Sequence, residues 1–130
     1  MKTKVLCICA KGMNRSKYLA GYLRRKGYSA KFGGVEPYEN PEYKWNPVSQ
    51  KKIDWADVVI VIRKRLVSIL KKNFKVHHKT KIILLNVTDS QNLIPSEFKH
   101  LRNINHKEFN KKWTYPQLRK AIGKYLPLKK

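Results

Sequence analysis

Acidic residues are scarce in this sequence. It has 8 Asp and Glu residues against 30 Lys and Arg residues among 130, which gives a formal net charge of +22 at pH 7. Such an excess favours an anionic partner or an anionic substrate, but it specifies neither a fold nor a chemistry. The basic residues are spread along the whole chain, and no zinc-finger or RNA-recognition signature is present. A solvated basic surface and specific nucleic-acid binding therefore both remain open.

Cysteines and long apolar runs are also scarce. The two cysteines are too few for a disulfide framework, which favours a reducing compartment and a cytoplasmic location. No apolar run approaches the roughly 18 residues that span a bilayer. The segment that follows residues 1–10 is basic and does not resemble a cleavage site, so we expect neither a membrane span nor a signal peptide.

Patterns for metals and nucleotides are absent as well. The nucleotide-binding pattern G-x4-G-K-[ST] does not occur. The two cysteines and four histidines match no zinc-binding spacing, the histidines being His77, His78, His100 and His106. We therefore expect no metal and no cofactor.

Apolar runs and helical patterns alternate along the chain. A length of 130 residues with 42% hydrophobic residues suits one domain covering residues 1–130. The expected strands lie at 4–9, 28–32, 58–62 and 82–85, and the expected helices at 16–26, 47–55, 64–73, 96–101 and 115–126. This alternation predicts an α/β fold, a single domain with a four-stranded parallel sheet and helices on both faces. Ligands of such sheets bind at the carboxyl ends of the strands.

Several residues predict where these elements begin and end. Ser16 is the expected N-cap of the first helix, and Gly27 is its expected stop. The pair at residues 33–34 is expected to end the second strand, and Asn46 or Ser49 to cap the second helix. Three prolines predict a loop over residues 35–47.

The segment from Cys9 to Ser16 lies between the first strand and the first helix and has the properties of an anion cradle. Loop N–H groups and a helix N-terminus converge there, and Arg15 can grip two oxygens of a tetrahedral anion. The same positive field favours the Cys9 thiolate, to which Ser16 can donate a hydrogen bond. A thiolate at the floor of such a cradle is positioned to attack phosphorus. The expected phosphate-binding residues are Ala10, Lys11, Gly12, Met13, Asn14 and Arg15.

Other residues near the cradle can be either structural or functional. Cys7 lies on the same strand face as Cys9 and is expected in the core rather than as a redox partner. Asp57 is expected to be structural. Three aromatic residues of the loop after the second strand form either a wall flanking the substrate or the packing of the loop itself: Tyr38, Tyr43 and Trp45.

These residues resemble a known family. The segment from Cys9 to Ser16 matches the C-x5-R-[ST] signature of protein tyrosine phosphatases, and its place after the first strand is similar to the low-molecular-weight class. The C-x4-N-R-S form most resembles the compact archaeal-type variety. The strand at residues 55–62 and the segment at residues 84–89 resemble two further family segments, the second of which supplies a general acid.

The resemblance implies a metal-free phosphatase acting through a phosphocysteine. Cys9 would be the nucleophile, Arg15 would bind phosphate, Ser16 would activate the thiolate and Asp89 would be the general acid. The implied substrate is a phosphorylated protein or a small aryl phosphate. Gly12 stands where this class usually has an asparagine, and Asn14 is expected to support the loop in its place.

Three alternatives use the same cradle. A basic nucleic-acid-binding module would hold a phosphate without turnover. A polynucleotide-end phosphatase would bind nucleic acid and also hydrolyse the phosphate at its end. An arsenate reductase is less favoured, because that chemistry requires resolving cysteines and Cys7 is the one other cysteine. The sequence predicts no oligomeric state.

Overall fold

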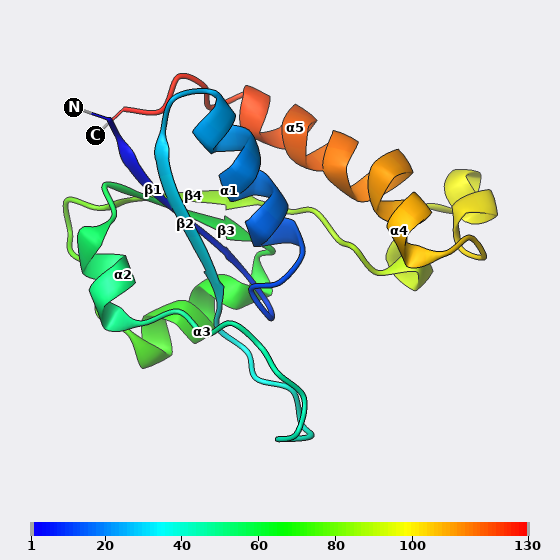
Figure 1. Ribbon diagram of the computed structural model, residues 1–130, viewed down its shortest axis with the longest axis horizontal. Coiled ribbons are helices and arrows are strands. Elements are labelled where there is room, and N and C mark those ends of the chain that lie inside the picture. Colours follow the sequence, from blue (N-terminus) through cyan, green and yellow to red (C-terminus); the bar gives the residue numbers. More distant parts are fainter. Residues whose placement is uncertain (1, 130) are drawn as a thin grey trace.

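The computed structural model describes residues 2–129, and its centre is a four-stranded parallel sheet (Figure 1). The strands are β1 (Lys4–Cys9), β2 (Ser29–Gly34), β3 (Val58–Ile62) and β4 (Lys81–Leu85), in the order β2-β1-β3-β4. Met1 and Lys130, which the expected domain includes, lie outside the described residues. The predicted α/β class and the parallel four-stranded sheet are confirmed.

Helices cover both faces of this sheet. Alternate residues of β1, such as Val5 and Cys7, pack with α1 (Arg15–Arg25) and α5 (Tyr115–Gly123). The residues between them, such as Leu6, pack with α2 (Gln50–Trp55) and α3 (Arg65–Asn73). β1 and β3 are central and buried on both faces, which explains why their sequences are continuous apolar runs.

Several element boundaries differ from the sequence prediction, and the second helix begins at Gln50 rather than at residue 47. The first helix begins at Arg15 with Asn14 as its N-cap, so the prediction that Ser16 caps it was wrong. The second strand starts at Ser29 and includes Gly33 and Gly34, because both glycines pair with the carboxyl end of β1. The last helix ends at Gly123 rather than at residue 126. Gly27 does follow the first helix with a φ of 98°, and Ser49 caps α2.

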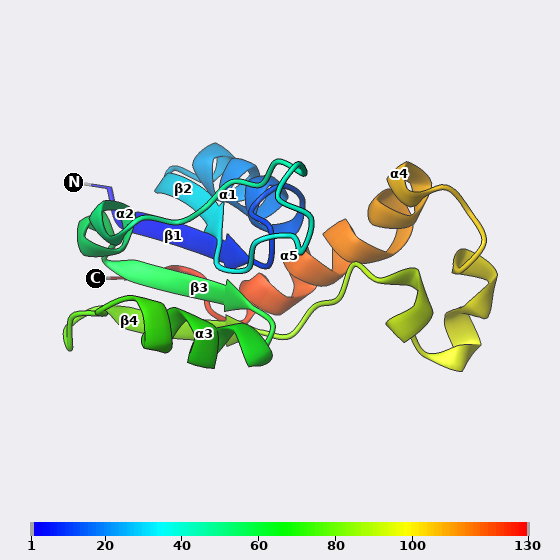
Figure 2. The same ribbon diagram turned by 90° about the horizontal axis from the view of Figure 1, so that it is seen from below.

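A small C-terminal unit extends away from the sheet (Figure 2). It contains two 3₁₀ turns (Gln91–Leu93 and Ser96–Leu101), the short helix α4 (His106–Phe109) and a π turn (Asn110–Thr114) that runs into α5. Its own core consists of Ile94, Leu101 and Phe109. Between residues 91 and 114 the sequence predicted only a short helix at 96–101, where the structure has a 3₁₀ helix. Among residues 2–129 no helix is long and apolar enough to cross a membrane.

Candidate active site

The cradle forms where β1 ends and α1 begins. Cys9 Sγ lies 3.1 Å from Ser16 Oγ, and both residues are buried. The contact exists because Ser16 is inside the first turn of α1, where its side chain faces back toward the end of β1. The N-terminus of a helix carries a partial positive charge and unpaired N–H groups, which favour an anion at this point. The structure therefore brings the predicted nucleophile and its hydroxyl partner together.

Gly12 is required by the tight turn of the cradle loop. Its φ is +72°, and a Cβ there would lie 2.4 Å from both Gly34 N and Asn46 O. Asn46 also supports the loop, because its side-chain amide donates to Gly12 O (3.2 Å) and its backbone N–H donates to Lys11 O (2.9 Å). The loop thus packs against the glycines of β2 and against Asn46, whose part in the cradle the sequence did not reveal.

Arg15 is held by the carboxyl ends of two other strands. Its Nη1 donates to Val87 O (3.0 Å), just after β4, and to Ile62 O (3.3 Å), the last residue of β3. Its Nε lies 3.5 Å from Asp89 Oδ1 and is buried without a hydrogen-bond partner among the described residues. The guanidinium is therefore fixed in orientation and retains a donor, as an anion site requires.

Asn14 links the cradle to Asp89 and to the C-terminal unit. Its Nδ2 donates to Asp89 Oδ2 (2.8 Å) and to Asn110 Oδ1 (3.2 Å), and its Oδ1 accepts from the Tyr115 hydroxyl (3.0 Å). His106 Nε2 also contacts the Asp89 carbonyl oxygen (3.2 Å). Burial, followed by the nearby Tyr18 and Asp89, raises the pKa of Tyr115, so its hydroxyl stays protonated and donates.

Lys11 of the cradle contacts the loop after β2, which carries the three aromatic residues singled out in the sequence. Lys11 Nζ donates to the carbonyls of Glu36 (3.0 Å) and Pro37 (2.9 Å) and lies 4.6 Å from the Tyr38 ring centre. Its ammonium is therefore engaged by the loop after β2. Tyr38 and Tyr43 form an edge-to-face pair at 5.6 Å, whereas Trp45, half-buried, joins no aromatic pair among residues 2–129. Met13 is exposed.

The other predicted residues have structural positions. Cys7 is fully buried in the sheet, unbonded, and its pKa is raised by burial and by the adjacent Cys9, as expected for a core thiol. Asp57 Oδ2 accepts a hydrogen bond from Lys4 N at 2.9 Å and so joins the starts of two strands. No group of three or more His, Cys, Asp or Glu residues suited to a metal occurs in the described part of the chain.

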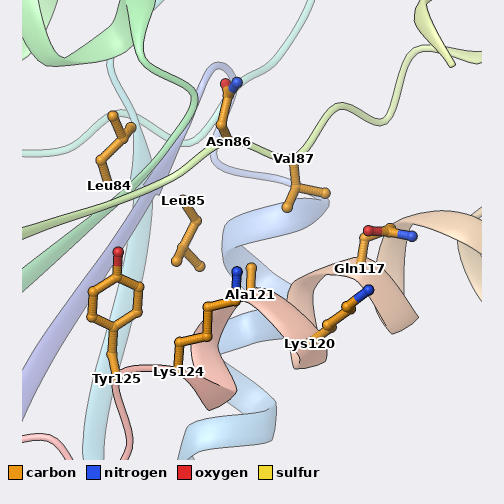
Figure 3. A pocket seen from close by; sticks show the side chains of 9 residues that line it. All are labelled: Leu84, Leu85, Asn86, Val87, Gln117, Lys120, Ala121, Lys124 and Tyr125. Atoms are coloured by element: carbon orange, nitrogen blue, oxygen red, sulfur yellow. The ribbon is translucent and has the colours of Figure 1, made fainter. Parts of the chain in front are cut away.

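A separate cavity of about 340 Å³ lies between β4 and α5 (Figure 3). Leu84 and Leu85 line it from the strand, and Lys120, Lys124 and Tyr125 line it from the helix and the segment that follows. None of the side chains that line it belongs to the cradle loop, and no cysteine, serine or carboxylate is among them. The candidate chemistry therefore resides at the cradle.

Comparisons with known proteins yield matches among solved structures. Neither a family model nor a curated protein sequence matches this chain. The tyrosine phosphatase Wzb from Escherichia coli, solved in complex with phosphate, matches with a TM-score of 0.61 at 15% identity over 96% of each chain. The chain has the fold of low-molecular-weight protein tyrosine phosphatases.

Two further phosphatases of this fold also match the chain over nearly their whole length. The low-molecular-weight protein tyrosine phosphatase from T. tengcongensis matches with a TM-score of 0.57 at 16% identity over 95% of this chain and 99% of that one. A low-molecular-weight phosphotyrosine phosphatase from Vibrio cholerae matches with a TM-score of 0.57 at 13% identity, over 92% of this chain and 91% of that one. The predicted resemblance is confirmed at the level of the fold, and its archaeal-type refinement stays a prediction.

Proposed function

We propose that this chain is a cysteine-dependent phosphatase that hydrolyses phosphomonoesters through a phosphocysteine intermediate, with residues 1–130 acting as one domain. The observation that carries the proposal is the 3.1 Å contact between Cys9 Sγ and Ser16 Oγ at the helix N-terminus. A thiolate there accepts the Ser16 hydrogen bond and meets a positive potential. The phosphatase fold supports the same conclusion. The two free cysteines suit a reducing, cytoplasmic setting.

The first chemical step transfers the phosphoryl group to sulfur. The Cys9 thiolate attacks phosphorus, the S–P bond forms, and the P–O bond to the leaving group breaks in line. Arg15 and the loop N–H groups bind the phosphoryl oxygens and stabilise the charge that they carry in the transition state. Asp89, protonated, gives its proton to the leaving oxygen. The Arg15 Nε, which lies 3.5 Å from Asp89 Oδ1 and makes no hydrogen bond among the described residues, is one donor for this task.

The second step returns the enzyme to its starting state. Asp89, now ionised, accepts a proton from a water molecule that attacks phosphorus. The S–P bond breaks, inorganic phosphate leaves, and the Cys9 thiolate is regenerated. Asn14 holds the Asp89 carboxylate at 2.8 Å, beside the cradle, during both transfers. The step consumes one water and needs no metal or oxidant.

Phosphotyrosine or a small aryl phosphate is the proposed substrate class. Tyr38 and Tyr43, exposed and in contact with each other, offer aromatic surface beside the cradle loop, with Trp45 in the same loop. Lys11 connects this loop to the cradle through two hydrogen bonds. An aryl ring packing on this surface would leave its phosphate free to enter the cradle.

Trapping the intermediate tests the proposal. The Asp89→Asn variant, mixed rapidly with para-nitrophenyl phosphate and quenched in acid, should carry one phosphoryl group on Cys9 by peptide mass spectrometry. The Cys9→Ser variant provides the control and should yield no phosphorylated peptide at that position. Phosphate found on a different residue, or a burst without any covalent adduct, would contradict the mechanism.

The net charge of +22 favours a second candidate, a phosphatase or binding module that acts on polynucleotide ends. Contacts with several nucleic-acid phosphates make affinity fall steeply and linearly with log salt. When log affinity is plotted against log salt concentration, the slope for a 5′-phosphorylated oligonucleotide should then be much more negative than the slope for an aryl phosphate. Equal slopes would exclude this candidate.

A further inference from the structure

A second basic hollow lies between α3 and β4. Its volume is about 800 Å³, and four cationic side chains and two apolar ones dominate its lining: Arg63, Lys64, Arg65, Lys71, Val67 and Leu84. No acidic residue lines it. We refer to it as the α3–β4 groove. Arg65 pairs with Glu36 outside the lining, and the positive charge of Arg63, Lys64 and Lys71 has no carboxylate in the lining to compensate it. Such a concentration of positive charge attracts an anionic group.

The groove begins beside the backbone that holds Arg15. Arg63 directly follows Ile62, and Asn86, which also lines the groove, directly precedes Val87. The carbonyls of Ile62 and Val87 are the acceptors of the Arg15 guanidinium. Consecutive Cα atoms are about 3.8 Å apart, so the groove lining is directly adjacent along the chain to each of these acceptors.

An ion pair joins the groove to the cradle loop on the other side. Arg65 Nη2 donates to Glu36 Oε1 at 3.1 Å, and the same carboxylate oxygen lies 3.7 Å from Lys11 Nζ. The hydrogen bond from Arg65 lowers the pKa of Glu36, with Lys11 adding to the effect, so the carboxylate stays ionised at neutral pH. The bridge therefore persists and keeps the start of α3 next to the cradle.

Arg63 has a strained backbone at this junction. Its φ is 149°, and it is the one non-glycine residue with a positive φ among residues 2–129. Its carbonyl accepts from Leu66 N at 3.1 Å, which fixes the first turn of α3. A strained backbone conformation persists only where the surrounding contacts hold it in place, and such residues are concentrated at ligand-binding and active sites.

We propose that the α3–β4 groove binds the acidic flank of a phosphorylated peptide whose phosphate occupies the cradle. The proposal rests on the proposed function and names its substrate class. Cations separated by Val67 and Leu84 suit a peptide with both acidic and apolar side chains. No aromatic side chain lines the groove, whereas binding of single-stranded nucleic acid relies on base stacking. β4 is also an edge strand, the position at which extended peptides add to sheets.

Neighbouring lysines of α3 provide a matched test. Lys71 lines the groove, whereas Lys72, also exposed and one residue further, does not. Lys71→Glu and Lys72→Glu change the net charge equally. The measurement is kcat/KM for a phosphotyrosine peptide with acidic flanks, divided by kcat/KM for para-nitrophenyl phosphate, which has no flank. Lys71→Glu should lower this ratio roughly threefold to tenfold, and Lys72→Glu less than about twofold.

A glutamine-flanked phosphopeptide completes the kinetic test. For this peptide, kcat/KM relative to para-nitrophenyl phosphate should change little with either substitution, because the peptide lacks the anionic group that the groove binds. Equal losses for Lys71→Glu and Lys72→Glu with the acidic peptide would overturn the proposal, since they would reflect net charge alone. A ratio that does not depend on the peptide flank in the unsubstituted protein would also overturn it.

Binding to a Cys9→Ser background separates this proposal from the proposed function. Fluorescence anisotropy of the labelled acidic phosphopeptide requires no turnover, so it reports on the groove even if the protein is inactive. The proposal is supported if Lys71→Glu weakens binding of the acidic phosphopeptide more than Lys72→Glu does. If a single-stranded RNA of equal charge binds more tightly than the peptide and shows the larger Lys71→Glu effect, the groove serves nucleic acid and the proposal is wrong.

Discussion

The side-chain amide of Asn14 donates a 2.8 Å hydrogen bond to the Asp89 carboxylate, across 75 residues of sequence. The first residue caps the helix that follows the cradle, and the second lies beyond the last strand. The Tyr115 hydroxyl, at the start of α5, holds the amide oxygen of Asn14 at 3.0 Å. The proposed acid is thus positioned by the cradle loop and by the C-terminal helix together.

Removing the Tyr115 hydroxyl should weaken that positioning. Tyr115→Phe keeps the ring, which stacks on Tyr18 at 3.9 Å, but loses the hydrogen bond to Asn14. We expect kcat to fall roughly threefold to tenfold for phenyl phosphate, a poor leaving group, and less for para-nitrophenyl phosphate. Tyr18→Phe removes a neighbouring hydroxyl outside this network and serves as the control. Equal losses on both substrates would show that Tyr115 does not act through the acid.

Asp89→Asn should remove the general acid itself. General acid catalysis contributes typically about 10²–10⁴-fold, so kcat should fall within that range for phenyl phosphate. The loss should be smaller for para-nitrophenyl phosphate, whose leaving group needs less protonation. Asp57→Asn changes a carboxylate that accepts a hydrogen bond from Lys4 N and should retain the wild-type kcat on both substrates. A wild-type kcat of Asp89→Asn on phenyl phosphate would move the acid to another residue.

Gly12→Ala should destroy the cradle. The added Cβ would lie 2.4 Å from backbone atoms of Gly34 and Asn46, on a φ that disfavours side chains. We expect loss of activity and a loss of at least about 1–3 kcal/mol in the free energy of unfolding, measured by urea denaturation. Gly123→Ala, which meets nothing within 4 Å, is the control and should be close to neutral. An active Gly12→Ala protein would contradict the described loop geometry.

The two cysteines should differ in reactivity. Cys7 is fully buried and burial raises its pKa, so it should remain a protonated thiol at neutral pH. Iodoacetamide should therefore alkylate Cys9 and spare Cys7 in peptide mapping of the folded protein, and inorganic phosphate should protect Cys9. Cys7→Ala should keep phosphatase turnover while losing stability. A folded Cys7→Ala protein that has lost turnover would contradict the purely structural position of Cys7.

The sequence was sufficient to predict the parts of the fold and site that depend on local patterns. The strands β1 and β3 are continuous apolar runs, and Cys9, Arg15 and Ser16 lie within one loop and its helix. The position of Ser16 illustrates the limit, because a serine before a helix suggests an N-cap, whereas here the helix begins at Arg15, one residue earlier. That shift directs the hydroxyl to Cys9 rather than to the backbone.

The parts that the sequence did not reveal depend on distant contacts. Asn110 and Tyr115 reach Asn14 across 96 and 101 residues, and the short turns between residues 91 and 114 have no regular apolar period. Asn46 supports the loop across 34 residues through a side-chain hydrogen bond to the Gly12 carbonyl, which no sequence pattern marks. Side-chain positions of this kind follow from tertiary packing, which a single sequence does not encode in any local signal.

Hydrolysis of para-nitrophenyl phosphate, with reductant and without added metal, tests the central claim most directly. The assay compares the wild type with Cys9→Ser and Cys7→Ser, which make the same atomic change at two positions of one strand face. We expect turnover by the wild type, retained turnover by Cys7→Ser, and none by Cys9→Ser. A folded wild-type protein that releases no nitrophenol, or a Cys9→Ser variant that does, would contradict it.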